Sequence, residues 1–294
     1  MTDTGQPTAD EPRWAFVNGE LVARSEARLD IQDRAAMFGD AVYEVIRYYS
    51  GTALALDDHR QRLERSLEAM RIEAPGVADR LTAATETLIE RHGWADARAY
   101  WQVSRGAAPR RHRPVDNLTP TELVLLDPEP PLGQRTGPDA ATAITLEDQR
   151  WHRCDIKSVM LAPATLAEMT ARDAGVDTAI FCRGERVTES VSANVLAVID
   201  GERVTPPADQ WILPGITRSL ILEVCREAGE PVVERVVTRE ELQAADEILL
   251  TGTTRHVTAV VELDGKPVGS GEVGPVAELV DRGLRELVVR RCGL

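Results

Sequence analysis

Short apolar runs joined by tight turns dominate the start of the chain. Residues 14–22 (WAFVNGELV) are two such runs connected by Asn18-Gly19, a pair that favours the two-residue turn of a β-hairpin. Residues 42–49 (VYEVIRYY) precede a Ser-Gly pair and another apolar run, which predicts a second hairpin. Residues 99–106 (AYWQVSRG) and 122–127 (ELVLLD) predict two further strands.

Two helices are expected between these strands. Leu63 and Leu67 recur at helical spacing, and Asp57 or Asp58 is placed to cap the start of that helix. A second helix is predicted from about residue 78 to 92. Strands and helices mixed in this way indicate an α/β (α+β) fold.

A segment rich in proline and glycine interrupts this pattern. Residues 128–138 (PEPPLGQRTGP) resist both helix and strand, which favours a linker between a smaller N-terminal α/β domain at 1–127 and a larger C-terminal one at 139–294. The second half contains predicted hairpin turns and helices, at Arg183-Gly184, Asp200-Gly201 and Asp264-Gly265, and near residues 163–174, 216–228 and 274–291. Gly229 is placed as the left-handed residue beyond the middle helix.

The charge balance narrows the class of partner. The chain has 48 acidic and 34 basic residues, a net charge of −14, which disfavours nucleic acid and anionic membrane surfaces and favours a small metabolite. The four cysteines lie far apart without a C-x-x-C pair, so neither a metal site nor a disulfide framework is expected. The polar, acidic start of the chain (MTDTGQPTADEPR) differs from a signal peptide, and no apolar stretch reaches the length of a membrane span. These features favour a cytoplasmic protein.

Lys157 is the first candidate for chemistry. It lies in CDIKSVMLA, between an isoleucine and an apolar run, in a chain whose cations are nearly all arginine. A lysine taken alone is most often a solvated surface charge. Burial between these apolar residues would lower its pKa, however, and an amine with a lowered pKa suits Schiff-base chemistry.

Three segments could hold a phosphate. Residues 213–218 (LPGITR) place a glycine turn before a regular helix, whose first N–H groups lack partners within the helix and suit an anion. Residues 251–254 (TGTT) offer hydroxyls after an apolar strand, and residues 59–62 (HRQR) offer an arginine for a two-point contact. Taken alone, each segment is more often an ordinary turn or a solvated helix face.

One acidic and one basic segment complete the candidates. Glu189, in residues 187–194 (VTESVSAN), leads into an apolar strand, where a carboxylate would be costly unless it met a cation or a hydrogen-bond donor. A protonated pyridine nitrogen would be such a partner, and an exposed hairpin glutamate is the equally weighted alternative. Residues 109–113 (PRRHR) could capture a substrate carboxylate, or could simply balance nearby acids.

Together and in this order, the motifs resemble one family: the branched-chain and D-amino-acid aminotransferases with the fold-type-IV arrangement of pyridoxal phosphate enzymes. The resemblance runs from DRAAMFGDAVYEVIR through DDHRQRLERS, CDIKS, VTESVSAN and LPGITR to ADEILLTGTTRHVTAV, nearly the whole chain. RCDIKS and PRRH look more like the D-amino-acid branch, because the asparagine and tyrosine that follow the lysine of branched-chain enzymes are missing here. The resemblance implies two domains, pyridoxal 5'-phosphate in the interdomain cleft, and a homodimer.

The resemblance also implies roles for individual residues. Lys157 matches the lysine that forms the Schiff base with the cofactor and shuttles the proton of the amino acid. Glu189 matches the carboxylate that faces the pyridine nitrogen, and Arg62 matches the phosphate-binding arginine. The other cofactor-binding residues implied are Ser192, Asn194, Gly215, Ile216, Thr217 and Thr253. No metal is expected.

The substrate side departs from the family pattern. Arg110 and His112 match an arginine and a histidine that grip the α-carboxylate, but Ala36 stands where we expect the tyrosine of the D-amino-acid branch. Other substrate-binding candidates are Arg28, Arg47, Arg111, Thr254 and Arg255.

The expected activity is ping-pong transamination of D-amino acids of the D-alanine and D-glutamate type, with 2-oxoglutarate or pyruvate as acceptor. Branched-chain L-amino acids and (R)-amines are alternative substrates. Aminodeoxychorismate lyase, which shares the fold and cofactor but eliminates pyruvate, is an alternative of another reaction class. A cofactor-binding protein that has lost its activity is an alternative outside catalysis. The presence of Lys157 and Glu189 argues against it.

Overall fold

The computed structural model describes residues 13–294, so nearly all of the polar N-terminal stretch lies outside the described residues. The chain divides into two compact units. The first comprises the chain up to Leu132 together with Ile156–Met160, and the second comprises Gly133–Asp155 and Leu161–Leu294. The division at residue 132 falls inside the segment 128–138. Residues 156–160, which contain Lys157, belong to the first unit, although the sequence pattern places them in the second domain.

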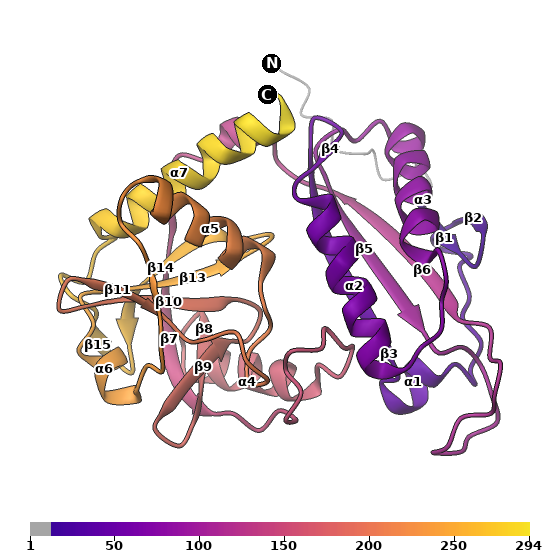
Figure 1. Ribbon diagram of the computed structural model, residues 1–294, viewed down its shortest axis with the longest axis horizontal. Coiled ribbons are helices and arrows are strands. Elements are labelled where there is room, and N and C mark those ends of the chain that lie inside the picture. Colours follow the sequence, from indigo (N-terminus) through magenta and orange to yellow (C-terminus); the bar gives the residue numbers. More distant parts are fainter. Residues whose placement is uncertain (1–12) are drawn as a thin grey trace. The chain divides into compact units, whose positions relative to one another are not determined.

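The first unit is built on a six-stranded antiparallel sheet in the order β2-β1-β6-β5-β3-β4 (Figure 1). Its strands are β1 (Trp14–Val17), β2 (Glu20–Ala23), β3 (Ala41–Tyr49), β4 (Thr52–Ala53), β5 (Ala97–Ser104) and β6 (Thr121–Pro128). Both predicted hairpins are confirmed, with Asn18 and Gly19 at positive φ in the first turn and Ser50 and Gly51 at positive φ in the second.

Two long helices of the first unit pack on the same face of this sheet (Figure 1). They are α2 (Leu56–Met70) and α3 (Val77–His92), and a short helix, α1 (Arg34–Phe38), precedes β3. Strand alternation supplies the sheet side of the core, where Ala97, Ala99, Trp101 and Val103 of β5 are all fully buried. The indole N–H of Trp101 donates to Thr85 Oγ1 of α3 at 2.7 Å, which fixes the helix on the sheet.

The predicted acidic cap of α2 is wrong. The helix begins at Leu56, its N-cap is Ala55 in the left-handed conformation, and no side chain caps it. Leu56 packs against the core of the first unit, so the helix starts as soon as the chain leaves the hairpin. Asp57 and Asp58 lie in the first turn, where a negative charge still interacts favourably with the helix dipole.

The second unit contains a nine-stranded mixed sheet. Its strands are β7 (Asp139–Glu147), β8 (Thr178–Arg183), β9 (Arg186–Ser190), β10 (Asn194–Ile199), β11 (Glu202–Thr205), β12 (Val233–Glu234), β13 (Glu247–Gly252), β14 (His256–Leu263) and β15 (Lys266–Pro267). The order is β12-β11-β10-β13-β14-β7-β8-β9, with β15 beside β14. The three predicted turns connect β8 to β9, β10 to β11 and β14 to β15, so these hairpins are confirmed.

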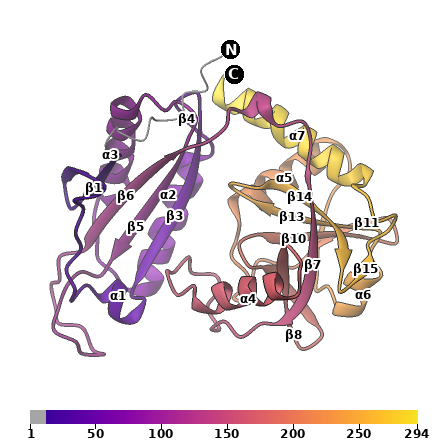
Figure 2. The ribbon, with the colours of Figure 1, turned by 180° about the vertical axis from the view of Figure 1, so that it is seen from behind.

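Helices α5 (Ile216–Glu227) and α7 (Pro275–Cys292) lie side by side next to β13 and β14, whereas α4 (Ala162–Asp173) packs beside β7 and β8 (Figure 2). A fourth helix, α6 (Arg239–Gln243), is short, and a 3-10 turn, η1 (Leu132–Gln134), lies at the division between the units. The close approach of α5 and α7 requires a glycine, because a Cβ on Gly283 would lie 2.4 Å from Val224 Cγ1. Between residues 13 and 294, no helix has both the length and the apolar character needed to cross a bilayer.

Candidate active site

Lys157 lies at the edge of the sheet of the first unit. Its carbonyl accepts the N–H of Tyr43 at 2.9 Å, and the next residue, Ser158, forms an antiparallel bridge with Val42. Its own N–H points to Ser66 Oγ of α2, at 3.4 Å. Residues 157–159 therefore extend the sheet beside the beginning of β3, on the edge that β4 occupies further along. The backbone of Lys157 is thereby held on a strand and next to a helix.

The side chain of Lys157 rests on a tyrosine that sequence reasoning missed. Lys157 is half-buried, and its Nζ lies 4.2 Å from the centre of the Tyr43 ring. Tyr43 stacks in turn on Tyr100, and the Tyr100 hydroxyl donates to Gln102 Oε1 at 2.7 Å. Burial raises the pKa of Tyr100 to about 12. The sequence offered no local signal for this contact, because it depends on the pairing of residues 41–43 with residues 157–159, which are far apart in the chain.

Arg62, the predicted phosphate ligand, lies in a buried cluster with Glu44 and His59. Its Nε and Nη2 donate to the two carboxylate oxygens of Glu44 at 2.8 Å each, and His59 Nδ1 lies 2.7 Å from Glu44 Oε2. Burial alone would raise the pKa of Glu44, but Arg62 and His59 hold it at about 2. Burial lowers the pKa of His59. The phosphate role of Arg62 stays a prediction, with Glu44 fixing the plane of its guanidinium.

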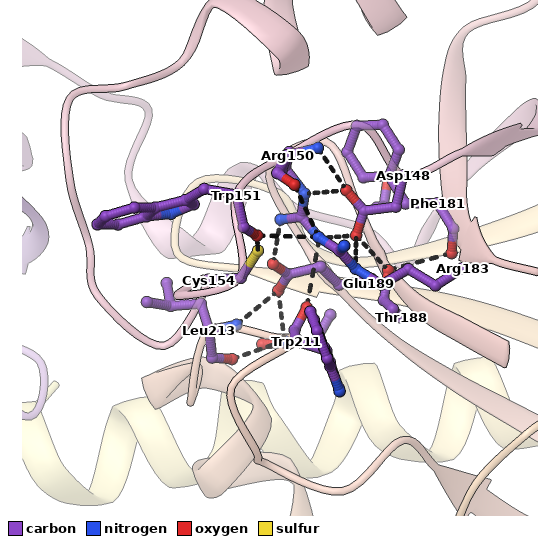
Figure 3. A network of polar contacts seen from close by, with 12 residues as sticks. Asp148, Arg150, Trp151, Cys154, Phe181, Arg183, Thr188, Glu189, Trp211 and Leu213 are labelled. Atoms are coloured by element: carbon purple, nitrogen blue, oxygen red, sulfur yellow. Dashed lines mark hydrogen bonds and ion pairs between the residues drawn. The ribbon is translucent and has the colours of Figure 1, made fainter. Parts of the chain in front are cut away.

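Glu189, at the end of β9, is buried rather than exposed in a hairpin. Only 5% of its surface is accessible, and three groups donate to its carboxylate (Figure 3). Arg150 Nη1 donates to Oε1 at 2.5 Å, and Oε2 accepts the N–H of Leu213 at 3.0 Å and Asn194 Nδ2 at 3.1 Å. Burial nevertheless raises the pKa of Glu189 above its ordinary value, because Arg150 and the Leu213 N–H compensate it only in part.

Arg150 does not belong to Glu189 alone. Its Nε and Nη2 bind the two oxygens of Asp148, each at 2.9 Å (Figure 3). Although burial alone would lower it, Glu189 and Asp148 hold the pKa of Arg150 above its ordinary value. Sequence reasoning missed both Arg150 and Asp148. The expectation that a buried glutamate needs a cation was met, but the sequence did not indicate which cation supplies it.

Asn194 and Gly215 join Glu189 to the start of α5. Asn194 Nδ2 donates to Glu189 Oε2 and to the Leu213 carbonyl, the latter at 2.9 Å. A Cβ on Gly215 would lie 1.9 Å from Asn194 Oδ1, an overlap that only glycine avoids. The structure therefore brings together three residues that the sequence placed in one site.

The first turn of α5 offers unpartnered donors. Gly215 is its N-cap and no side chain caps the helix, so its first N–H groups are suited to an anion. Ile216 and Thr217 follow and are largely buried. Asn194, at the start of β10, pairs with Thr251 near the end of β13. Three further candidate site residues lie close in sequence to Asn194 or Thr251. Thr253 is partly buried, whereas Ser192 and Thr254 are exposed.

The other arginines proposed for the substrate carboxylate differ in their contacts. Arg47 is buried and donates to the carbonyls of Tyr48, Ala97 and Pro130, so its guanidinium is engaged by backbone. Arg28 is exposed and donates to two neighbouring carbonyls. Arg255 is partly buried in the second unit, and Ala36 is exposed on α1. In these contacts Arg28 uses Nη1 alone, and a substrate role for Arg28 or Arg47 stays a prediction.

The basic loop at 109–113 is held by an arginine that sequence reasoning did not assign. Arg34 of α1 is buried, and it donates to the carbonyls of Arg111 at 2.7 Å and His112 at 3.2 Å. Its Nε binds Asp40 at 2.7 Å. The side chains of Arg110, Arg111 and His112 remain exposed, so the backbone is fixed while the cations stay accessible.

These groups suit pyridoxal phosphate. The first unit offers an amine against an aromatic ring, and the second offers a buried carboxylate beside a helix start with unpartnered N–H groups. An aldehyde, a basic ring nitrogen and a phosphate are the complementary partners of such a set. Within the described residues, no group of three or more histidine, cysteine or acidic side chains could hold a metal ion.

Comparison with known proteins agrees with this chemistry. Residues 41–263 match the family model described as amino-transferase class IV. The D-alanine aminotransferase of Bacillus licheniformis is 38% identical over 92% of this chain and 96% of its own length, and that of Staphylococcus haemolyticus is 36% identical over 94% and 98%. Among solved structures, the branched-chain amino acid aminotransferase of Escherichia coli has a TM-score of 0.87 at 25% identity and covers 96% of both chains.

A second solved structure is of an enzyme in its pyridoxal phosphate form. The branched-chain amino acid aminotransferase of Thermobaculum terrenum in this form has a TM-score of 0.83 at 26% identity, and the match covers 95% of both chains. The family match and the identities to relatives along most of the chain establish membership. The chain belongs to the class IV aminotransferases, and it is a pyridoxal-phosphate-dependent enzyme of fold type IV.

Proposed function

We propose that this aminotransferase transfers the amino group of D-amino acids, of the D-alanine and D-glutamate type, to an α-keto acid such as pyruvate or 2-oxoglutarate. One observation carries the proposal. Identity to the D-alanine aminotransferases is 34% to 38% along more than nine-tenths of the chain, whereas identity to the branched-chain structures is 25% to 27%. Donor and acceptor would use the same groups in turn, which gives ping-pong kinetics.

Lys157 is the reactive amine in this proposal. When bound, pyridoxal phosphate supplies an aldehyde for amines and a ring that accepts an electron pair. Lys157 Nζ would hold the cofactor by its aldehyde, and as a free amine it would move the proton at the substrate Cα. Its strand-edge backbone and its contact with the Tyr43 ring support this role, because they restrict where Nζ can reach.

Glu189 holds a proton on the pyridine nitrogen. A buried carboxylate with fixed donors on both oxygens is suited to pair with a cationic ring nitrogen. Ile216 and Thr217 at the α5 start, and Thr253, would hold the phosphate of the cofactor, and Arg62 is assigned to the same group.

The substrate carboxylate is assigned to Arg110 and His112. Arg34 fixes the backbone of their loop, which limits the entropy lost when the side chains bind. Tyr43 offers a phenol beside Lys157 and is a better candidate than position 36 for the expected tyrosine. The proposal also includes a homodimer, as expected for the family, and a cytoplasmic location consistent with four buried thiols.

Transamination of branched-chain L-amino acids is the second candidate. It is favoured by the TM-scores of 0.83 to 0.87 with branched-chain aminotransferases. Backbone similarity at this level is compatible with either D- or L-amino acids as substrates, because the side chains around the reacting carbon decide specificity.

A half-reaction panel tests the proposal. The pyridoxal-loaded enzyme is mixed with D-alanine, D-glutamate, L-leucine, L-valine or an (R)-amine without a keto acid, and loss of the pyridoxal absorbance is followed. We expect rapid loss with both D-amino acids and none with the Lys157→Ala variant. Faster reaction with L-leucine than with either D-amino acid would select the branched-chain candidate. Retention of the pyridoxal absorbance with every one of these donors, in protein that has bound the cofactor, would favour the lyase candidate instead.

A further inference from the structure

Asp148 and Glu189 compete for one guanidinium. Arg150 presents two nitrogens, Nε and Nη2, to the two oxygens of Asp148, and only Nη1 reaches Glu189 (Figure 3). The two-point contact between a guanidinium and a carboxylate is the stronger and more directional arrangement. Asp148 therefore determines the plane of Arg150, and Glu189 receives one donor from its edge.

Asp148 is itself fixed in place. It is 5% exposed, and it follows β7 directly, where its N–H donates to the Cys182 carbonyl of β8 at 2.7 Å. Thr188 Oγ1 donates to its Oδ2 at 3.2 Å, and Arg183 Nε lies 3.2 Å from the same oxygen. Although burial alone would raise the pKa of Asp148, Arg150 and Arg183 lower it, so the carboxylate is charged.

We propose that Asp148 is a positioning residue for Glu189: by engaging two of the three nitrogens of Arg150, it keeps the guanidinium from closing on Glu189, whose charge stays available to the pyridine nitrogen. The inference rests on the proposed role of Glu189. Without Asp148, Arg150 would gain the freedom to bind both oxygens of Glu189, as Arg62 binds both oxygens of Glu44. Glu189 would then hold a ring proton less tightly.

The charges around Glu189 predict opposite effects for two neutral variants. The groups facing Glu189 are Arg150, Asp148, Asn194 and the Leu213 N–H, and the nearby Cys154 is a buried thiol whose pKa burial raises. Asp148→Asn removes an anion, so the proton shared by Glu189 and the ring nitrogen should leave at lower pH. Arg150→Met removes a cation, so that proton should leave at higher pH. A role limited to packing predicts no such difference in sign.

The experiment is a pH titration of the absorbance of the cofactor-loaded enzyme, without substrate, for the parent protein and five variants. They are Asp148→Asn, Asp148→Glu, Arg150→Met, Glu189→Gln, and Asp127→Asn as matched control. Asp127 is an aspartate that also meets several arginines, with Arg24 Nη1 at 2.7 Å and Arg98 Nη2 at 3.7 Å, but it lies in the first unit. Melting temperature and cofactor retention are measured on the same samples.

We expect the midpoint of the titration to fall by about one to three pH units in Asp148→Asn and to rise by about as much in Arg150→Met, the upper figure being the shift from one charge about 4 Å away at an effective dielectric constant near 20. Asp127→Asn should titrate like the parent. In Asp148→Asn, kcat for a D-amino acid should fall about tenfold relative to the parent protein. In the control Asp127→Asn, kcat should stay at the parental value. Asp148→Glu, which retains the charge, should restore the parental midpoint.

The inference would be overturned by any of the following results. Shifts of the same sign in Asp148→Asn and Arg150→Met, or no shift in Asp148→Asn while Glu189→Gln changes the titration, would reject the role of Asp148 but keep that of Glu189. A parental titration and parental activity in Glu189→Gln would instead reject the proposed role of Glu189, and the inference with it. If Asp148→Asn does not fold, the sign of the Arg150→Met shift decides, since a fall or no change contradicts the mechanism.

Discussion

Two buried glutamates, one in each unit, meet an arginine in different ways. Glu44 is fully buried and takes both its oxygens to Arg62, with His59 as an additional partner. Glu189 is 5% exposed and takes one oxygen to Arg150, whose other donors bind Asp148. The pKa of Glu44 is held at about 2, whereas the pKa of Glu189 is raised above its ordinary value.

The difference shows that burial beside an arginine does not by itself set the charge state of a carboxylate. Burial disfavours both anions, and what separates them is the set of neighbouring charges: the Glu44 carboxylate is contacted by Arg62 and His59, whereas Glu189 shares Arg150 with the anion Asp148. Glu44 binds Arg62 through both of its oxygens, so it behaves as a structural ion pair. Glu189 shares its arginine and remains responsive to another partner, which is the property required of a group that holds a ring proton.

The largest effect is expected from Glu189→Gln. Loss of the anion beside the pyridine nitrogen should lower kcat by about 10²-fold to 10³-fold, the range seen when one preorganised electrostatic group is removed from an active site. The melting temperature should stay unchanged or rise, because the variant removes a buried charge whose pKa is raised. Steady-state kinetics and thermal melting measure the two effects, and parental kcat would contradict the proposed role.

Glu44→Gln should affect stability first. It leaves the Arg62 guanidinium buried without its carboxylate, a change that typically costs about 3 to 5 kcal/mol of unfolding free energy. Urea denaturation measures this loss. The control is Glu230→Gln, which removes a half-exposed partner of Arg203 and should cost about 1 kcal/mol or less. Equal losses in the two variants would mean that the Glu44 pair is not the stronger of the two.

Acid titration of stability sharpens the comparison. Because the pKa of Glu44 is lowered to about 2 from an ordinary value of 4.5, its contribution is present above pH 4.5 and is lost as the pH falls toward 2. The loss should amount to about 3 kcal/mol and should be missing in Glu44→Gln. The raised pKa of Glu189 has the opposite sign, so stability falls as the pH rises above 4.5. Urea midpoints measured from pH 2.5 to 7 should therefore change with pH in different ways for Glu44→Gln and Glu189→Gln. Parallel curves for these two variants would contradict the opposite pKa shifts of the two glutamates.

A third buried carboxylate, Asp40, has the opposite arrangement, because it binds two arginines, Arg34 and Arg105. Although burial alone would raise the pKa of Asp40, these arginines lower it.

The smallest effect is expected from Arg34→Met. This variant should loosen the 109–113 loop and raise KM for D-alanine about tenfold, the loss of one to two hydrogen bonds to a charged group. KM for an amine without a carboxylate should not change. Arg28→Met, which removes an exposed arginine, is the control, and equal KM changes for both amines would reject the loop role.

Local signals predicted most of the fold. The hairpin turns and the helices near 78–92, 163–174, 216–228 and 274–291 were correct because turn residues and apolar spacing act over a few residues. The cap of α2 was wrong because a left-handed Ala55 and core contacts of Leu56 decided where that helix begins. Placement of residues 156–160 could not be predicted, since it depends on pairing with β3 at a separation of more than 100 residues.

The candidate site shows the same limit. Glu189, Asn194 and Gly215 were recognisable from their motifs, and the structure brings them into contact. Arg150 and Asp148 were not, because their meeting with Glu189 requires the register of β7, β8 and β9. The charge argument indicated that a cation was needed but could not choose among the many arginines of the chain.

The edge position of residues 156–160 has a consequence for how the polypeptide can be divided. The chain passes between the units three times, near residues 132, 155 and 160, so the first unit is not encoded by a continuous stretch. A fragment ending at Leu132 would leave the N–H and C=O groups of residues 41–43 unpaired along a sheet edge, a surface that recruits strands from other molecules. In this chain the segment that carries Lys157 also covers that edge.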